Sequence, residues 1–216
     1  MKFEDLNDES ILYLGNITNT KQEQHKNFFG VSPYNWGSEK DIVHDIKEKF
    51  PLGDCSICGI QSEDVFEHLT IEELIPILDE MYRILKVGSF MRVSLPDYNS
   101  PLLMKRSIYN YKGEIICDSL VGSYMVLDGE VIPKKGTDGN DHMWFPILDT
   151  VYDIIRRSKF NDSKIKLHHG FYDRDKYICD DFDASIYSVK RCPPNDMRNN
   201  GKPVSIILDL FKENIK

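Results

Sequence analysis

"TIEELIPILDEMYRILKVGSFMRVSLPD" (70–97) decides the fold, because one continuous stretch contains the start of a helix, its end and the strand that follows. Apolar residues recur every three or four positions over 71–85, which predicts an amphipathic helix with one buried face. Thr70 and Glu73 have the spacing of a capping box, which fixes the helix start. Residues 89–95 then predict a buried strand after a glycine turn.

That strand stops at Pro96-Asp97, and in open α/β sheets ligands bind just outside the carboxyl ends of the strands. Earlier in the chain, short apolar runs suit four more strands, at 11–15, 28–32, 41–46 and 56–62. Strands that alternate with polar turns, together with one strong helix, predict an α/β fold with a largely parallel sheet.

The pattern changes in the second half of the chain. Residues 110–141 contain several glycines and show no sustained period, which is typical of a functional lid or an insertion. Helical spacing resumes over 148–155. The runs 185–191 and 204–211 suit strands joined by a Pro- and Asn-rich loop, so a C-terminal antiparallel hairpin is expected at one edge of the sheet. The 216 residues are expected to form a single domain.

The charge balance excludes some classes of partner. The chain has 27 Lys and Arg against 35 Asp and Glu, a net charge of -8 at pH 7. A negative surface repels phosphate backbones and anionic lipid heads, so we expect neither a nucleic acid nor a membrane as partner. No apolar run is long enough to span a bilayer or marks a leader, which predicts a cytoplasmic protein. The 5 cysteines are an odd, scattered set, so reduced thiols are expected.

Residues 44–97 resemble the central half of the class I S-adenosylmethionine-dependent methyltransferases. In that family the fourth strand runs into a Glu-His turn, the next helix ends in the phrase Tyr-Arg-x-Leu-Lys-Pro-Gly-Gly, and the fifth strand ends in Pro-Asp. Here the phrase reads "YRILKVGS" (82–89). Residues 142–160 and 201–212 are similar to the family's following helix and last strand. The resemblance implies a single-domain, Rossmann-like methyltransferase fold.

The resemblance also implies a binding place for the cofactor S-adenosylmethionine. In the family, the first strand runs into a Gly-x-Gly-x-Gly loop beside the methionine end of the cofactor. Here that loop reads "LGNITN" (14–19), so Gly15 and Asn16 take its place. Ile17 and Asn19 stand at the second and third glycine positions, where a branched side chain is expected to stiffen the loop and fill ligand space.

Five further residues match cofactor positions of the family. Ser32 stands where the family has the acid that binds the ribose diol, and a serine can make one such bond without charge assistance. Asp45 and Ile46 match the pair that flanks the adenine. Gln61 and Ser62 close the fourth strand where the family lines the cofactor's sulfonium.

His142 is the candidate catalytic residue. It follows the glycine-rich stretch and precedes "MWF" (143–145), which would put an imidazole at the mouth of the cleft. An imidazole suits a general base that removes a proton from a hydroxyl or an amine. The alternative is that His142 caps the helix that begins near Pro146.

Asp64, Glu67 and His68 stand at i, i+3 and i+4, so one helical turn would bring them to one side. Some quinone-modifying methyltransferases of this class hold a divalent metal with Glu, Glu and His at that spacing. Acids near a helix start also simply offset the helix dipole. We favour the second interpretation because short charge clusters are usually solvated faces, and we expect no metal site.

Two functions remain open at this point. The first is a methyltransferase that uses S-adenosylmethionine to methylate a small polar acceptor, such as a sugar or another metabolite. Methyl transfer needs positioning more than a nucleophile motif, so the sequence does not identify the acceptor. The second is a non-catalytic relative that has lost cofactor binding, which Ile17, Asn19 and Ser32 favour, and that serves as a ligand-binding or interaction module.

Overall fold

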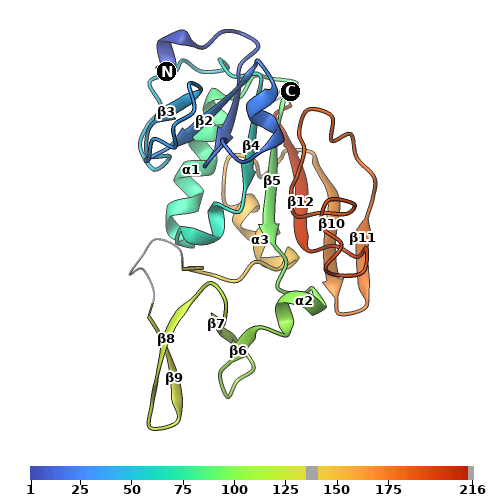
Figure 1. The fold of residues 1–216 in the computed structure, drawn as a ribbon. Helices are drawn as coiled ribbons and strands as arrows, with labels where there is room; N and C mark the ends of the chain where they lie inside the picture. Colours follow the sequence, from blue (N-terminus) through green and yellow to red (C-terminus); the bar gives the residue numbers. More distant parts are fainter. Residues whose placement is uncertain (135–140, 214–216) are drawn as a thin grey trace.

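The computed structural model describes residues 1–134 and 141–213. Its centre is an eight-stranded sheet with the order β11-β10-β12-β5-β4-β1-β2-β3 (Figure 1). The strands of this sheet are β1 (Ile11–Leu14), β2 (Phe28–Ser32), β3 (Asp41–Val43), β4 (Gly59–Glu63), β5 (Phe90–Pro96), β10 (Ile165–Asp173), β11 (Lys176–Cys179) and β12 (Ser205–Phe211). The helices are η1 (Phe3–Asp5), η2 (Lys21–Gln24), η3 (Phe66–His68), α1 (Ile71–Ile84), α2 (Pro101–Met104) and α3 (Leu148–Arg156).

The first five strands run parallel to one another. Their carboxyl ends therefore share one edge of the sheet, which we call the carboxyl edge. The other three strands are antiparallel to their neighbours. The prediction of an α/β fold with a mostly parallel sheet and an antiparallel end is confirmed.

The predicted pairing at the antiparallel end is wrong in one respect. Residues 185–191 form no strand, and the hairpin consists of β10 and β11 instead. β12 lies between β5 and β10 and pairs with both in the antiparallel sense. The alternating pattern of 185–191 has another cause, because Val189 is buried against Ile207 of β12 and Tyr187 packs against Phe28.

Helix α1 begins where the capping box places it. The Thr70 hydroxyl accepts a hydrogen bond from the Glu73 N–H at 3.3 Å, and the Glu73 carboxylate accepts one from the Thr70 N–H at 2.9 Å. After its last residue the chain turns at Gly88, whose φ of +83° favours glycine. The start of the helix is therefore set by local residues.

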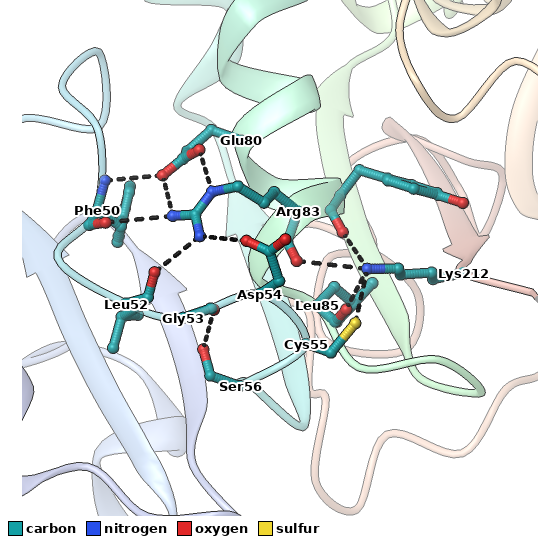
Figure 2. Close-up of polar contacts among 11 residues, drawn as sticks. Phe50, Leu52, Gly53, Asp54, Cys55, Ser56, Glu80, Arg83, Leu85 and Lys212 are labelled. Atoms are coloured by element: carbon teal, nitrogen blue, oxygen red, sulfur yellow. Dashed lines mark hydrogen bonds and ion pairs between the residues drawn. The ribbon is translucent and has the colours of Figure 1, made fainter.

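The side chains of Arg83 and Lys212 form hydrogen bonds that hold the C-terminal end of α1 in place (Figure 2). Arg83 donates to the Glu80 carboxylate at 2.6 and 2.7 Å, and to the Leu52 carbonyl and Asp54 carboxylate beside it. The buried Lys212 amine donates to the carbonyls of Tyr82 and Leu85, at 2.7 and 2.8 Å, which satisfies carbonyls that a helix end leaves free. The chain before β4 and the end of β12 are thus held against one helix end.

The two faces of the sheet are covered differently. Helices α1 and α3 cover one face, where the main apolar core includes Leu78, Val151 and Leu208. On the other face lie two segments without α-helix, 15–27 and 180–204, which cover β1, β4 and β12 (Figure 1). None of the helices in the described part of the chain is long and apolar enough to cross a membrane.

An excursion between β5 and α3 lies beyond the carboxyl edge (Figure 1). It contains α2 and two separate two-stranded sheets, formed by β6 (Ser107–Tyr109) with β7 (Ile115–Asp118) and by β8 (Ser123–Leu127) with β9 (Glu130–Lys134). The predicted insertion at 110–141 therefore contains regular strands, and its residues 135–140 lie outside the described residues.

Candidate functional site

The clearest cluster of chemically active side chains lies just beyond β4, on η3 and on the segment before α3. Glu67 and His68 belong to η3, and His142 comes from the distant segment. That segment is bonded to η3 directly after His142. The Met143 N–H donates to the Glu67 carbonyl at 2.7 Å, and the Trp144 indole donates to the Phe66 carbonyl at 3.0 Å.

The three side chains face one another in a buried place. The Glu67 carboxylate is 0% exposed and the His142 imidazole 4%. Glu67 Oε1 lies 3.8 Å from His142 Nε2 and 4.0 Å from His68 Nε2. Within residues 1–134 and 141–213, neither oxygen of Glu67 has a hydrogen-bond partner.

A second row of polar groups orients His142. The Tyr98 hydroxyl donates to Asp118 Oδ2 at 2.5 Å, and it lies 2.7 Å from His142 Nδ1. An ionised carboxylate can only accept, so the phenol oxygen accepts from His142 Nδ1–H. Arg106 forms an ion pair with the same carboxylate, at 2.7 Å. His142 Nε2 is therefore the unprotonated nitrogen, and it faces Glu67.

Burial determines the charge states in this cluster. It lowers the pKa of His142 to about 3, and it also lowers the pKa of His68. Burial raises the pKa of the Glu67 carboxyl well above its usual range, and the Asp64 carboxylate raises it further. Near neutral pH both imidazoles are consequently neutral, and each offers the lone pair of Nε2 to a hydrogen-bond donor or a metal ion.

Asp64 does not share a helical turn with Glu67 and His68, contrary to the prediction. Its φ of +52° turns the chain away before η3 begins at Phe66. Its carboxylate pairs with Arg191 at 2.8 Å. His142 likewise does not cap α3, whose N-cap is Ile147.

The loop after β1 turns sharply at Gly15, which has a φ of +113°. Asn16 is half-buried, and its side-chain oxygen accepts from the N–H and the hydroxyl of Thr18, at 2.9 and 2.6 Å. The expectation that Ile17 fills ligand space is wrong. Its side chain is fully buried on the sheet face away from α1, where it packs with Tyr13 and Phe28.

Ser32 ends β2 and is 6% exposed. Its hydroxyl accepts two hydrogen bonds, from the Trp36 indole at 2.9 Å and from the Tyr34 N–H at 3.1 Å. The hydroxyl proton remains for one donation. A single bond to a ribose oxygen is therefore what this position can supply.

Asp45 and Ile46, which follow shortly after β3, differ in exposure. Asp45 has a side chain 37% exposed, with one oxygen accepting from the Lys47 N–H at 3.0 Å. Ile46 is 7% exposed and belongs to the main core. Asp45 can accept from a ligand amine, whereas Ile46 is mostly covered by the protein itself.

Gln61 and Ser62 are both buried. The Gln61 amide donates to the Ser188 carbonyl at 2.8 Å and accepts from the Gln22 amide at 3.0 Å. Ser62 is 1% exposed and points to the opposite face of β4. Both side chains belong to the packing around β4 rather than to an open surface.

The residues at the carboxyl edge fit S-adenosylmethionine, but they offer it fewer contacts than the family pattern does. Gly15, Asn16, Ser32 and Asp45 lie at or shortly after the ends of three adjacent parallel strands, and all of them except the buried Ser32 are partly exposed. Ile17 is turned away from this edge. The cofactor, when bound here, supplies an electrophilic methyl group, while these residues would hold its adenosyl and methionine parts.

No protein-family model matches the sequence, and no curated protein sequence matches it. Solved structures do. S-adenosylmethionine-dependent methyltransferases from Thermotoga maritima and Methanosarcina mazei are 16% and 11% identical to the chain, each with a TM-score of 0.51. The matches cover 96% of this chain and 84% of the first, and 97% of this chain and 95% of the second. An Archaeoglobus fulgidus methyltransferase is 16% identical, with a TM-score of 0.50 over 93% of this chain and 85% of the other.

The chain therefore has the class I S-adenosylmethionine-dependent methyltransferase fold. The Rossmann-like architecture expected from the sequence is confirmed. Identities this low establish the fold alone.

Sequence reasoning singled out Glu67, His68 and His142 without joining them. It missed the roles of Tyr98 and Asp118, which orient His142. The one available signal was position, since Tyr98 immediately follows the Pro-Asp end of the fifth strand, where ligands are expected.

Proposed function

We propose that the protein is an S-adenosylmethionine-dependent methyltransferase that acts on a small polar acceptor. The observation that carries this proposal is the buried cluster of Glu67, His68 and His142 beyond the carboxyl edge of a methyltransferase fold. Buried polar groups without partners are costly, so they persist in a fold mainly where function requires them.

The two halves of the proposed site are close together. Gly15 lies against Val65, whose side chain is 3.1 Å from the place where a β-carbon on Gly15 would stand. Val65 is the N-cap residue of η3, which carries Glu67 and His68. A methyl donor held at Gly15 would therefore adjoin the polar cluster.

The residues of this chain have separate roles in the proposal. Asn16, Ser32 and Asp45 hold the methyl donor. His142 Nε2 and the Glu67 carboxylate accept hydrogen bonds from a hydroxyl or an amine of the acceptor, and His142 is the candidate base for its proton. Burial excludes water from the reacting groups, and positioning supplies most of the rate.

A cofactor-free relative is the second candidate, and two observations favour it. The connection between β1 and β2 contains only the four-residue helix η2. The hydroxyl of Ser32 already accepts two hydrogen bonds. Such a protein would keep the fold as a ligand-binding or interaction module.

Isothermal titration with S-adenosylhomocysteine separates the two candidates. A methyltransferase should bind it with a micromolar Kd, and Asp45→Ala should abolish that binding. Glu48→Ala is the matched control, because Glu48 is an exposed acid three residues further along. Absence of heat with the folded wild-type protein would overturn the proposal and leave the second candidate.

A further inference from the structure

We propose that Glu67, His68 and His142 form a binding site for one zinc ion. The expectation of no metal concerned a set of ligands that included Asp64, which the structure pairs with Arg191 instead. The proposed zinc ligands differ from that set, because His142 replaces Asp64 and brings a second imidazole from a distant part of the chain. The zinc site does not rest on the proposed methyl transfer.

The protons of the two imidazoles lie on the nitrogens that face away from Glu67. His68 Nδ1 lies 3.2 Å from the Asp141 carbonyl oxygen, which can only accept, so this nitrogen carries the proton. His142 Nδ1 donates to Tyr98, as derived above. Both Nε2 atoms consequently present lone pairs toward the Glu67 carboxylate. Three electron-pair donors therefore face the same space, because the bonds at Nδ1 keep both imidazole protons out of it. A positive ion fits such a space.

The distances between the Glu67 carboxylate and the two imidazoles suit a metal ion better than a shared proton. The separations of 3.8 and 4.0 Å between Glu67 Oε1 and the two Nε2 atoms exceed the hydrogen-bonding range of about 2.7–3.2 Å. A shared proton therefore does not bridge these atoms. Ligand bonds of about 2.0–2.1 Å in a tetrahedral zinc site put two ligand atoms about 3.4 Å apart. A few tenths of an ångström of closure brings these two separations to that value, and the ligand atoms of all three residues lie within 4.8 Å of one another.

Glu67 has no arginine or lysine partner among the described residues. Glu67 is 0% exposed, and a buried carboxylate stays ionised only when it is paired with a cation or bound to a metal. The two arginines of this region are already engaged, since Arg106 pairs with Asp118 and Arg191 pairs with Asp64. A bound cation would give Glu67 the partner that the described residues do not.

The donor set indicates which ion. Two imidazoles and one carboxylate are a known zinc ligand set that leaves a fourth position open, whereas magnesium and calcium prefer oxygen ligands alone. The outer contacts are also of the kind that metal-bound histidines make, because the second nitrogen of each ring donates to a carbonyl or a hydroxyl. Zinc would occupy His142 Nε2, so a zinc-bound His142 cannot be the base proposed above.

The test is a competition titration of the full chain, free of any tag and stripped of metal, with Zn²⁺ and a chromophoric chelator. Native mass spectrometry gives the stoichiometry. We expect one zinc per chain, at least about a hundredfold loss of affinity in Glu67→Gln and in His142→Gln, and a ten- to hundredfold loss in Tyr98→Phe. Millimolar Mg²⁺ should not compete.

Three matched controls should bind zinc as the wild type does. Glu72→Gln changes an exposed acid, His25→Gln changes a histidine outside the cluster, and Cys58→Ser breaks the Cys55–Cys58 pair of exposed thiols. If Glu67→Gln fails to fold, His68→Gln tests the same site at a more exposed position. Zinc retained by the folded cluster variants, zinc lost only in Cys58→Ser, or no zinc in the wild type would each overturn the proposal. None of these readouts depends on cofactor binding.

Discussion

Arg92 of β5 and Asp209 of β12 form an ion pair with two hydrogen bonds, at N–O distances of 2.7 and 2.8 Å. The pair lies on the sheet face that residues 180–204 cover. Arg92 and Asp209 are direct partners in the antiparallel ladder, and their side chains are 5% exposed. His168 contacts the same carboxylate at 2.8 Å. The pair therefore fixes the register of the strand that joins the parallel and antiparallel parts of the sheet.

Arg92→Leu and Asp209→Leu should each lower the free energy of unfolding by about 3–5 kcal/mol, because each leaves an uncompensated buried charge. The double variant should be less destabilised than the sum of the two. Urea denaturation measures all three, and single variants within 1 kcal/mol of the wild type would contradict the estimate.

Glu63→Gln should change how stability depends on pH. Burial raises the pKa of the Glu63 carboxyl to about 7, and Asp64 adds to the shift. The folded protein therefore holds this proton up to about pH 7, while the unfolded chain releases it near 4.5, so stability from this group falls as pH rises through that window.

The amide of Gln can still accept from the Lys190 and Arg191 N–H groups, as the Glu63 carboxylate does. Glu63→Gln should therefore be more stable than the wild type at pH 8, by on the order of 1–3 kcal/mol, with a flatter profile between pH 4.5 and 7. Burial also raises the pKa of Asp97 to about 7, so the stability of Glu63→Gln should still fall somewhat as the pH rises. Exposed Glu72→Gln is the control. An unchanged profile in Glu63→Gln would contradict the assignment.

Hydrogen exchange should separate the β8–β9 hairpin from the central sheet. The hairpin is a two-stranded sheet that is not joined to the central one, and Val126 and Leu127 on it are exposed. Amides of residues 123–133 should exchange at least about a hundredfold faster than those of 91–95. Equal protection of the two segments would show that the hairpin is covered in solution.

Ile17→Ala tests whether Ile17, in the loop after β1, is a core residue or a side chain that blocks the ligand. Because Ile17 is a core residue beside Phe28, the substitution should cost about 2–4 kcal/mol of stability and should not tighten binding of S-adenosylhomocysteine. Exposed Val87→Ala should cost little. Tighter binding without a loss of stability would restore the original expectation that Ile17 blocks the ligand.

Ser32→Asp should tighten binding of S-adenosylhomocysteine about ten- to a hundredfold, because a carboxylate makes charge-assisted bonds to a ribose diol. An aspartate can still accept from the Trp36 indole, which now bonds to the Ser32 hydroxyl. Asn35→Asp adds the same charge three residues away and is the control. Unchanged affinity in a protein that already binds tightly would show that β2 ends elsewhere relative to the ribose.

The sequence was sufficient to predict the start and the buried face of α1, because its capping box and its periodicity are local. It was misleading at 185–191, where alternate residues are buried by packing on a sheet face and not by strand pairing. Periodicity reports which side chains are buried and not what covers them. For the same reason it could not join His142 to Glu67, since their contact depends on backbone bonds between η3 and a segment far away in the chain.

The position of β12 has a consequence for the protein's synthesis. This strand is the last of the sheet in chain order, yet it lies between β5 and β10 in the interior. While the ribosome is still translating, the nascent chain must keep one edge of β5 unpaired, including the backbone beside Arg92. An open edge can pair with other chains, so the growing polypeptide is most vulnerable to aggregation until residues 205–211 emerge and close the sheet.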